Sequence, residues 1–583
     1  MPHSVPVPPT GFQALILCGP GVSLNTFTSN PEEFPKALIP VANRPMVFYP
    51  LDWCYRQGIT NITLITPPPS QAPLEAALSQ NPHLTSLPSP SPSVLAPTGL
   101  TLTTGTAELL RLPEVQACIK SDFLLLPCDL ICDIPGESLL GAWMVSQSAL
   151  GGSTLSGGWS TNGPKTIGMG GEAVGRRGGL AVYYQTKGRE ESIKGEVSDF
   201  VATAPLERDE APAVSHSAHE PAAIRFGLSK LVLSMPMDTV KERMEEDKGL
   251  LIRHSLVKKH AKVKMLTSYR DGHIYILPFW VKDFVRLNEK FESVSEDLVG
   301  WWAKSNWQTG LGTKLRLNEV LQPSSHKHGE SGSVDDESLE EEIDIKAMST
   351  TKASSRECPD PSSPESASEF QFASRVRTSG SGSGIEPPRP ENLTIPPILA
   401  YMHSSLPSAP LIRRVDTSAL LLSVSLRLAK LESIEEVGRV AASPFAHQQK
   451  VAYPAGIAQR CTVTKSDCLL GPNVTVDEKC VIKETVISAN CHIASGARLT
   501  RCLVMDGAVI GERCQLTGCI VGRRSKIERE SVLKDCEIQD GMVVEEGTDA
   551  KNEKFMVFEG LDEAGEGMDV SEDFGDDGGD LGF

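Results

Sequence analysis

A 17-residue repeat in the C-terminal part of the chain constrains its fold more than any other feature. From Cys468 the sequence divides into five consecutive segments of 17 residues, such as CLVMDGAVIGERCQLTG. Three columns of this repeat, six residues apart, are aliphatic almost throughout. They are Leu470, Ile487, Val504, Val521 and Ile538; Val476, Ile493, Ile510, Ile527 and Val544; and Ile482, Leu499, Leu516 and Leu533, with Ala550 at the fading end. A helix needs apolar steps of three and four residues. The six-residue step therefore predicts a left-handed parallel β-helix of hexapeptide coils over residues 456–550.

Two further columns of the repeat hold small residues, many of them cysteines. They are Cys468, Thr485, Cys502, Cys519 and Cys536; and Cys480, Ala497, Cys514, Ser531 and Thr548. Because thiols alternate with Thr, Ala and Ser, we predict tight interior positions and no metal ladder. Elsewhere, Cys128 and Cys132 lack the second pair that a zinc site needs. We therefore predict no bound metal and reduced thiols, which are typical of the cytosol.

Residues 12–322 alternate apolar runs with helical stretches. Strands are expected at 12–18, 61–66, 122–130, 180–185 and 272–278, and a helix at 46–57. This alternation predicts an α/β domain with a mixed or mainly parallel sheet covered on both faces. The Pro- and Ser-rich residues 67–98 and the polar residues 203–222 are predicted to be loops.

The acidic residues of the chain are concentrated in two segments. The net charge is −18, but residues 335–344 carry seven acids and residues 559–583 carry ten, with no base in either. The remainder is nearly neutral, which argues against nucleic-acid binding through a basic face. Residues 323–396 are predicted to be a disordered insert and residues 551–583 a disordered acidic tail. Residues 397–455 are expected to return to the core as a connecting segment. Since no apolar run approaches about 18 residues, no membrane contact is expected.

Several motifs resemble known families. Gly19, Gly21, residues 34–41 (FPKALIPV), residues 104–108 (TGTAE) and Asp129 resemble the nucleotidyltransferase-like domain of nucleotide-sugar pyrophosphorylases, in which a β-helix follows. Three further segments are more specifically similar to fungal-type gamma subunits of eukaryotic translation initiation factor 2B. They are GGLAVYYQTK at 178–187, SYRDGHIYILPFWVKDFV at 268–285 and SVSEDLVGWW at 293–302.

This resemblance implies a non-catalytic, structural and regulatory subunit in the cytosol. The family works in a complex of alpha, beta, gamma, delta and epsilon subunits that exchanges GDP for GTP on initiation factor 2. The resemblance therefore implies the epsilon subunit as first partner, then the alpha, beta and delta subunits and initiation factor 2. It implies no cofactor and no direct contact with nucleic acid. The exchange catalyst lies on a C-terminal helical domain of epsilon, and we expect none in the acidic tail here.

The same resemblance marks candidate nucleotide contacts at Gly19, Gly21, Lys36, Gly105, Thr106 and Asp129. In a working pyrophosphorylase loop, Thr and Arg would stand where this chain has Val22 and Ser23. Loss of one such charge stabiliser costs about 10²–10³ in rate. We therefore predict little or no pyrophosphorylase turnover and assign no catalytic residue. Asp129 matches a magnesium ligand of the family, and Asp271 is our candidate for the second acid. A single carboxylate holds Mg²⁺ poorly.

Structural roles stay open for these residues: Asp129 as the cap of a strand, Lys36 as the partner of a local acid, and Gly105-Thr106 as a turn before a helix near Ala107. Two enzyme functions also stay open. One is a sugar-1-phosphate nucleotidyltransferase such as a mannose-1-phosphate guanylyltransferase. The other is an acyltransferase, although His492 precedes the inward Ile493 and is predicted to point outward.

One corner of the repeat is basic. Arg523, Arg524 and Lys526 stand where other segments have small or acidic residues. This corner is either solvated or a contact for an acidic partner.

Overall fold

The structure is a computed structural model that describes residues 11–19, 22–101, 103–149, 178–206, 227–246, 248–250, 252–321, 395–406 and 409–557. The predicted insert up to residue 394, the loop from residue 207 and the tail from residue 558 lie outside these ranges.

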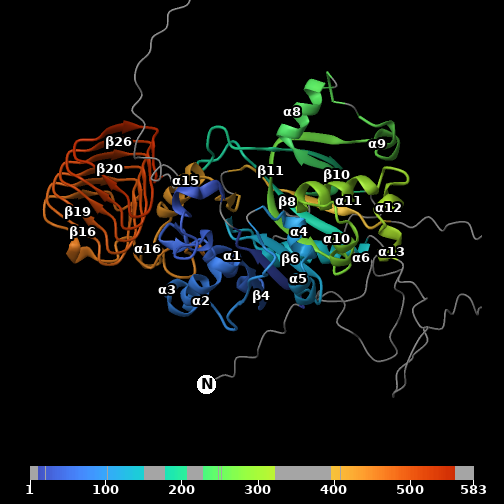
Figure 1. The fold of residues 1–583 in the computed structure, drawn as a ribbon, viewed down its shortest axis with the longest axis horizontal. Coiled ribbons are helices and arrows are strands. Elements are labelled where there is room, and N and C mark those ends of the chain that lie inside the picture. Colours follow the sequence, from blue (N-terminus) through green and yellow to red (C-terminus); the bar gives the residue numbers. More distant parts are fainter. Residues whose placement is uncertain are drawn as a thin grey trace, which may run out of the picture. The chain divides into compact units, whose positions relative to one another are not determined.

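A nine-stranded sheet forms the centre of the α/β domain (Figure 1). Its strands are β1 (Gln13–Leu17), β4 (Asn61–Ile65), β5 (Ser93–Leu95), β6 (Phe123–Pro127), β8 (Gly179–Gln185), β9 (Asp199–Ala204), β10 (Leu228–Pro236), β11 (Lys264–Leu277) and β12 (Ile398–Met402). Their order is β5-β4-β1-β6-β11-β8-β12-β10-β9. The predicted strands are all present. The sheet is mixed, as the predicted fold class allows: β5, β4, β1 and β6 run parallel, whereas β11 runs antiparallel to both β6 and β8.

Two small β-ribbons accompany the sheet. One pairs β2 (Pro40–Val41) with β3 (Arg44–Pro45), and the other pairs β7 (Leu130–Cys132) with β13 (Ile412–Arg414). Because β12 and β13 come from residues after 395, that part of the chain is built into the α/β domain. The predicted strand 122–130 is interrupted, since β6 ends at Pro127 and Asp129 lies in the turn before β7.

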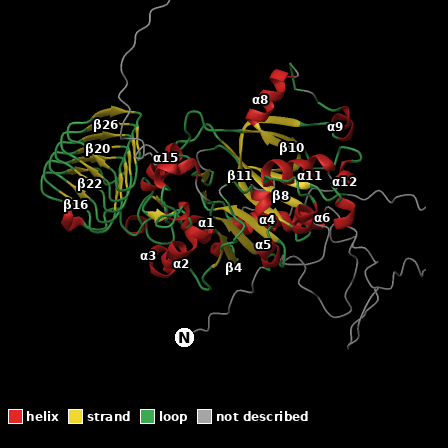
Figure 2. Cartoon of the chain, in the orientation of Figure 1, coloured by secondary structure: helices red, strands yellow, loops and turns green. Residues whose placement is uncertain are grey.

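Helices surround the sheet (Figure 2). They are α1 (Phe48–Arg56), α2 (Gln71–Gln80), α3 (Pro82–Thr85), α4 (Thr106–Arg111), α5 (Pro113–Cys118), α6 (Gly136–Ala149), α8 (Met237–Glu246), α9 (His254–Lys259), α10 (Val281–Leu287), α11 (Gly300–Ser305), α12 (Leu311–Lys314), α13 (Leu317–Leu321), α15 (Ser418–Ala429) and α16 (Ile434–Val437). The 3-10 turns are η1 (Val22–Phe27), η2 (Lys36–Leu38), η3 (Pro68–Ser70) and η6 (Pro454–Gly456), and η4 (Val294–Val299) is a π-helical turn. The helix predicted at 46–57 is α1, in which Pro50 occupies the first turn.

The prediction of a long loop at 67–98 is wrong. This segment contains η3, α2, α3 and the edge strand β5. Pro68, Pro73 and Pro82 misled the prediction because they stand in first turns, where backbone N–H groups have no helical partner. Asn81 caps α3 by accepting a hydrogen bond from the His83 N–H at 2.9 Å.

The repeat folds as predicted into three parallel sheets of short strands, a left-handed β-helix (Figure 2). The first holds β14 (Thr462–Val463), β17 (Val481–Lys483), β20 (Arg498–Thr500), β23 (Gln515–Thr517), β26 (Val532–Lys534) and β29 (Asp549–Lys551). The second holds β15 (Leu469–Leu470), β18 (Val486–Ile487), β21 (Leu503–Val504), β24 (Ile520–Val521), β27 (Glu537–Ile538) and β30 (Lys554–Phe555). The third holds β16 (Thr475–Val476), β19 (His492–Ile493), β22 (Val509–Ile510), β25 (Lys526–Ile527) and β28 (Val543–Val544).

The residues of the three predicted aliphatic columns form the interior of the β-helix. Every aliphatic residue of the three predicted columns is at most 2% exposed, and Ala550 is 7% exposed. The predicted start of the tail at residue 551 is too early, because Lys551 ends β29 and β30 pairs with β27.

One outer face of the β-helix packs against the α/β domain within a single structural unit. The outward residues Leu469, Val486, Leu503 and Ile520 of the second sheet are buried in the same core as the α/β domain. Asn43 fixes this contact, since its Nδ2 donates to the Ile487 carbonyl at 2.9 Å and its Oδ1 accepts from Ser488 at 2.9 Å. The second sheet is therefore an intramolecular surface.

Candidate functional site

The structure brings two of the predicted site residues together. Asp129, in the turn after β6, and Lys36, at the start of η2, form an ion pair in which Lys36 Nζ lies 2.6 Å from Asp129 Oδ2. Their side chains are only 1% and 12% exposed, respectively. Both residues therefore belong to one buried site at the end of the parallel strands.

The other carboxylate oxygen of Asp129 contacts a residue that was not predicted from the sequence. Arg414, the last residue of β13, places its Nε 3.4 Å from Asp129 Oδ1. Pairing of β13 with β7 sets Arg414 opposite Leu130, and the Val415 N–H donates to the Asp129 carbonyl at 2.8 Å. Both carboxylate oxygens of Asp129 thus face cationic side chains of the same chain.

A chain of ion pairs continues from Arg414 into the domain. Arg414 lies 3.7 Å from Asp416, whose Oδ2 also accepts from Arg270 at 2.5 Å. Arg270 in turn lies 3.4 Å from Glu196. Since these groups alternate in sign, the described side chains of this network leave no uncompensated cluster of positive charge for a phosphate.

The pKa values of the central groups reflect this pairing. Burial alone would raise the pKa of the Asp129 carboxyl, but Lys36 and then Arg414 hold it well below its usual range. Burial also opposes the charge on Lys36, yet the Asp129 carboxylate raises the pKa of Lys36 above its ordinary value. Asp129, Lys36 and Arg414 therefore remain ionised together.

The candidate second acid, Asp271, is held in a different way. It is buried in β11, where its Oδ1 accepts from the His273 N–H at 2.8 Å and its Oδ2 accepts from the Tyr275 hydroxyl. Burial and the neighbouring Asp199 carboxylate raise the pKa of Asp271 to about 7. His273 has a positive φ of 51°, which is uncommon outside glycine. Burial and then Arg414 lower the pKa of His273 well below its usual value, so its imidazole is neutral.

These donors do not fit a magnesium ion. Magnesium takes carboxylate oxygens, water and phosphate oxygens in octahedral geometry. Here the oxygens of Asp129 face two cations, and each oxygen of Asp271 already accepts a hydrogen bond. Within the described part of the chain, no cluster of three or more His, Cys, Asp or Glu residues could hold a metal.

The glycine loop is described only in part. Gly21 lies outside the described residues, and the structure gives no side-chain environment for Val22 and Ser23. Gly19 follows β1, and a Cβ placed on it would meet no atom within 4 Å. The space beside Gly19 is therefore open.

Gly105 and Thr106 have a structural environment of their own. A Cβ on Gly105 would lie 2.2 Å from the Glu292 carbonyl oxygen, so the close approach requires glycine. Thr106 begins α4, and its hydroxyl accepts from the Val294 N–H at 2.9 Å. Both residues attach the start of α4 to residues 292–294.

The basic corner of the β-helix contacts the α/β domain. Arg523 and Arg524 lie 3.2 and 2.8 Å from the same oxygen of Glu33. The Arg523 guanidinium also stacks on the Phe34 ring at 3.6 Å from its centroid. Lys526 pairs instead with Glu528 at 2.6 Å. The acidic group that contacts the two arginines is therefore a residue of this chain.

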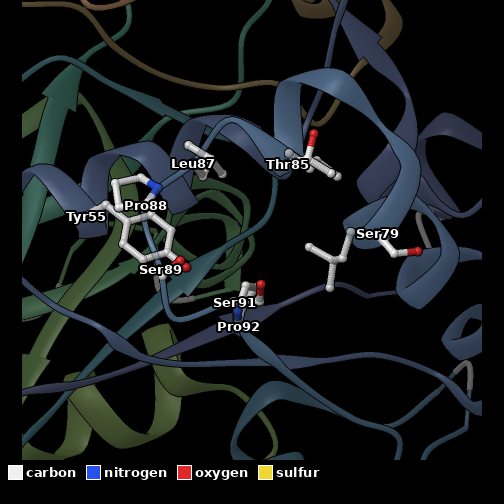
Figure 3. A pocket seen from close by; sticks show the side chains of 10 residues that line it. Tyr55, Ser79, Thr85, Leu87, Pro88, Ser89, Ser91 and Pro92 are labelled. Atoms are coloured by element: carbon white, nitrogen blue, oxygen red, sulfur yellow. The ribbon is translucent and has the colours of Figure 1, made fainter.

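A pocket of about 250 Å³ is lined by residues of α1, α2 and α3 and of the segment between α3 and β5 (Figure 3). Its described lining includes Tyr55, Ser79, Thr85, Ser89 and Ser91 and holds no charged side chain. None of the predicted nucleotide contacts belongs to this pocket.

His492 is partly exposed on the outer surface of the β-helix, on β19, as predicted from its place before Ile493. Its Nδ1 lies 2.8 Å from the Thr475 hydroxyl and its Nε2 lies 3.7 Å from Asp477. It is thus a surface residue with polar neighbours on the coil before it.

The fold defines a class of protein: an α/β domain with a glycine loop at the end of its first strand, joined to a left-handed β-helix. Comparison with known proteins narrows this class. Residues 449–550 match the family model described as the EIF2B subunit epsilon LbH domain. The chain is also 25% identical over 315 residues to the translation initiation factor eIF2B subunit gamma of Schizosaccharomyces pombe, which covers 54% of this chain and 56% of the relative.

Both comparisons find similarity to eIF2B subunits: the C-terminal residues resemble the β-helix domain of the epsilon subunit, and the longer match is to a gamma subunit. The match spans only a little over half the length of that relative. Among the helices that the structure describes, none has the length and apolar character to span a membrane.

Proposed function

We propose that this chain is a non-catalytic, structural and regulatory subunit of an eIF2B-type complex in the cytosol. In this proposal it takes the gamma position and binds an epsilon-like subunit first, then alpha-, beta- and delta-like subunits. The complex as a whole would exchange guanine nucleotide on initiation factor 2. The similarity to a gamma subunit supports this position.

The proposal that the chain is non-catalytic rests on one observation: both carboxylate oxygens of Asp129 face cationic side chains of the same chain. A nucleotidyl transfer site needs cations free to neutralise the leaving pyrophosphate. Here Lys36 is bound to Asp129 at 2.6 Å, and Arg414 covers the second oxygen at 3.4 Å. A triphosphate would have to break this buried pair and leave Asp129 without its counter-charge.

A sugar-1-phosphate nucleotidyltransferase is the second candidate. It is favoured by the meeting of Lys36 and Asp129 at the strand ends and by the open space beside Gly19. The two functions differ in what Lys36 does: it neutralises Asp129 in the first and contacts phosphate in the second.

The test starts from the full chain, purified from its own cells together with whatever chains accompany it. We expect mass spectrometry to find the other eIF2B-type subunits and initiation factor 2. We expect the sample to release labelled GDP from initiation factor 2 and to form no nucleotide sugar from GTP or UTP, hexose 1-phosphate and Mg²⁺. Purification as a lone chain that releases pyrophosphate at enzyme-like rates would refute the proposal and support the second candidate.

A further inference from the structure

One segment of the chain is basic, although the chain as a whole is acidic. Residues 248–264 carry six lysines and arginines and no acid, although the net charge of the chain is −18. Arg253, Lys258, Lys262 and Lys264 are exposed. We call residues 248–264 the basic segment. Its local charge runs against the sequence-based argument that the chain has no basic face.

The fold holds the basic segment in place. Leu256 of α9 is 3% exposed and packs with Ala204, Val232 and Trp307 in a small core of its own. Lys258, Lys262 and Lys264, which follow Leu256, are exposed. Val257 and Ile252 are 57% and 48% exposed, so apolar side chains are interspersed among the charges.

Most bases of this segment have no salt-bridge partner within the part of the chain that the structure describes. Among the described residues, no carboxylate forms an ion pair with Lys248, Arg253, Lys258, Lys262 or Lys264. Elsewhere on the surface, exposed bases commonly have acidic neighbours, as in the pairs Arg513–Glu530 and Arg529–Glu546. A surface of this kind favours an acidic occupant.

The basic segment lies next to the point where the acidic insert rejoins the described chain. Lys259 of α9 donates to Asn306 Oδ1 at 3.0 Å, and Asn306 Nδ2 donates to the Ile395 carbonyl at 3.2 Å. On the other side of the insert, the described chain ends at Leu321, and the acidic run 335–344 begins 14 residues later. A chain of that length reaches on the order of 40 Å when extended.

We propose that the basic segment is the docking site of the chain's own acidic run, residues 335–344. The run has seven acids and no base, and two isoleucines and a leucine near it complement the exposed Val257 and Ile252. The short tether gives the run an effective concentration in the millimolar range at this surface. The docked run shields the lysines from other polyanions. This inference does not depend on the proposed function.

Carbodiimide cross-linking of the full chain with its associated chains tests the contact directly, because the reagent joins carboxylates to lysine amines in contact. We expect cross-linked peptides that join residues 335–344 to Lys258, Lys262 or Lys264, and their loss in about 0.5 M salt, where screening is strong. Cross-links of the run only to other surfaces, or none at all, would overturn the proposal.

Competition provides a second test, with a fluorescent peptide of residues 333–345 as the probe. In the neutralised chain, the seven acids of residues 335–344 are replaced by Asn and Gln. We expect the peptide to bind this chain about tenfold more tightly than the native chain, because the native run competes with the peptide for the same surface. The triple variant Lys258→Gln, Lys262→Gln, Lys264→Gln, made in the neutralised chain, should lose this binding at least about tenfold. The matched control Lys483→Gln, Lys534→Gln, Lys551→Gln on the exposed face of the β-helix should retain it.

Two results contradict the proposal in this assay. One is equal peptide affinity for the native and neutralised chains. The other is a labelled single-stranded RNA that binds the native chain as tightly as the neutralised one, since the basic segment would then be open to nucleic acid.

Discussion

Replacement of Asp129 by asparagine tests whether its ion pairs hold the fold together. Asparagine keeps the shape of the side chain and removes its charge. Lys36 and Arg414 then remain buried around a neutral amide, with Asp416 at 3.7 Å as the remaining counter-charge near Arg414. We therefore expect Asp129→Asn to weaken the folded state substantially.

The size of the effect follows from burial. Removal of one partner from a buried pair costs about 3–5 kcal/mol, because the other charge is left without compensation. Since Asp416 compensates Arg414 in part, we expect a value near the lower end, about 3 kcal/mol. The double variant Asp129→Asn, Lys36→Met removes both members of the 2.6 Å pair and should recover part of the loss.

Urea unfolding of the full-length variants, followed by fluorescence of the buried tryptophans, measures these changes. Asp238→Asn is the matched control, since it removes one partner of an exposed pair with Lys241 and should unfold at the wild-type urea concentration. An Asp129→Asn protein with wild-type stability would refute the structural role of the pair. A double variant less stable than the single would refute the proposed origin of the loss.

Three further outcomes are expected from the same measurement. Leu503→Ala should cost about 2–5 kcal/mol, because Leu503 faces outward from the β-helix yet is fully buried against the α/β domain, whereas the exposed Val532→Ala should cost little. Gly105→Ala should cost about 1–3 kcal/mol, because the new methyl would lie 2.2 Å from the Glu292 carbonyl; wild-type stability would contradict this contact. Burial and then Arg44 lower the pKa of His447 to about 3, so below about pH 6.5 the unfolded chain gains a proton that the folded chain does not. The contribution of His447 to stability should therefore fall by about 1.4 kcal/mol per pH unit from pH 6.5 towards pH 3, and the difference in stability between the native chain and His447→Gln should change with that slope as the pH is lowered.

The β-helix was predictable because each coil repeats the same local environment. Every inward position lies 17 residues from its equivalents, so burial leaves a periodic mark on the sequence. The docked face left a mark too: the column Leu469, Val486, Leu503 and Ile520 is aliphatic and then changes to Glu537. That change coincides with the end of the apolar contact to the α/β domain. This second aliphatic column was not among the predicted interior positions.

The candidate site was less accessible to prediction, because its contacts are remote in sequence. Asp129 could be predicted because it follows a strand, and Lys36 because it follows a proline in a recognisable motif. No local sequence pattern indicates that Arg414 is their neighbour. Arg414 reaches the site only because β13 pairs with β7 after the chain returns from beyond residue 395. The positive φ of His273 is likewise a property of the backbone irregularity between β11 and β8, which composition does not reveal.

The closed state of the candidate site and the docking of the β-helix involve the same short segment. Glu33 is held by Arg523 and Arg524 of the β-helix, and three residues later Lys36 is held by Asp129. Phe34, between them, lies under the Arg523 guanidinium. The β-helix therefore anchors the backbone segment from which Lys36 reaches Asp129.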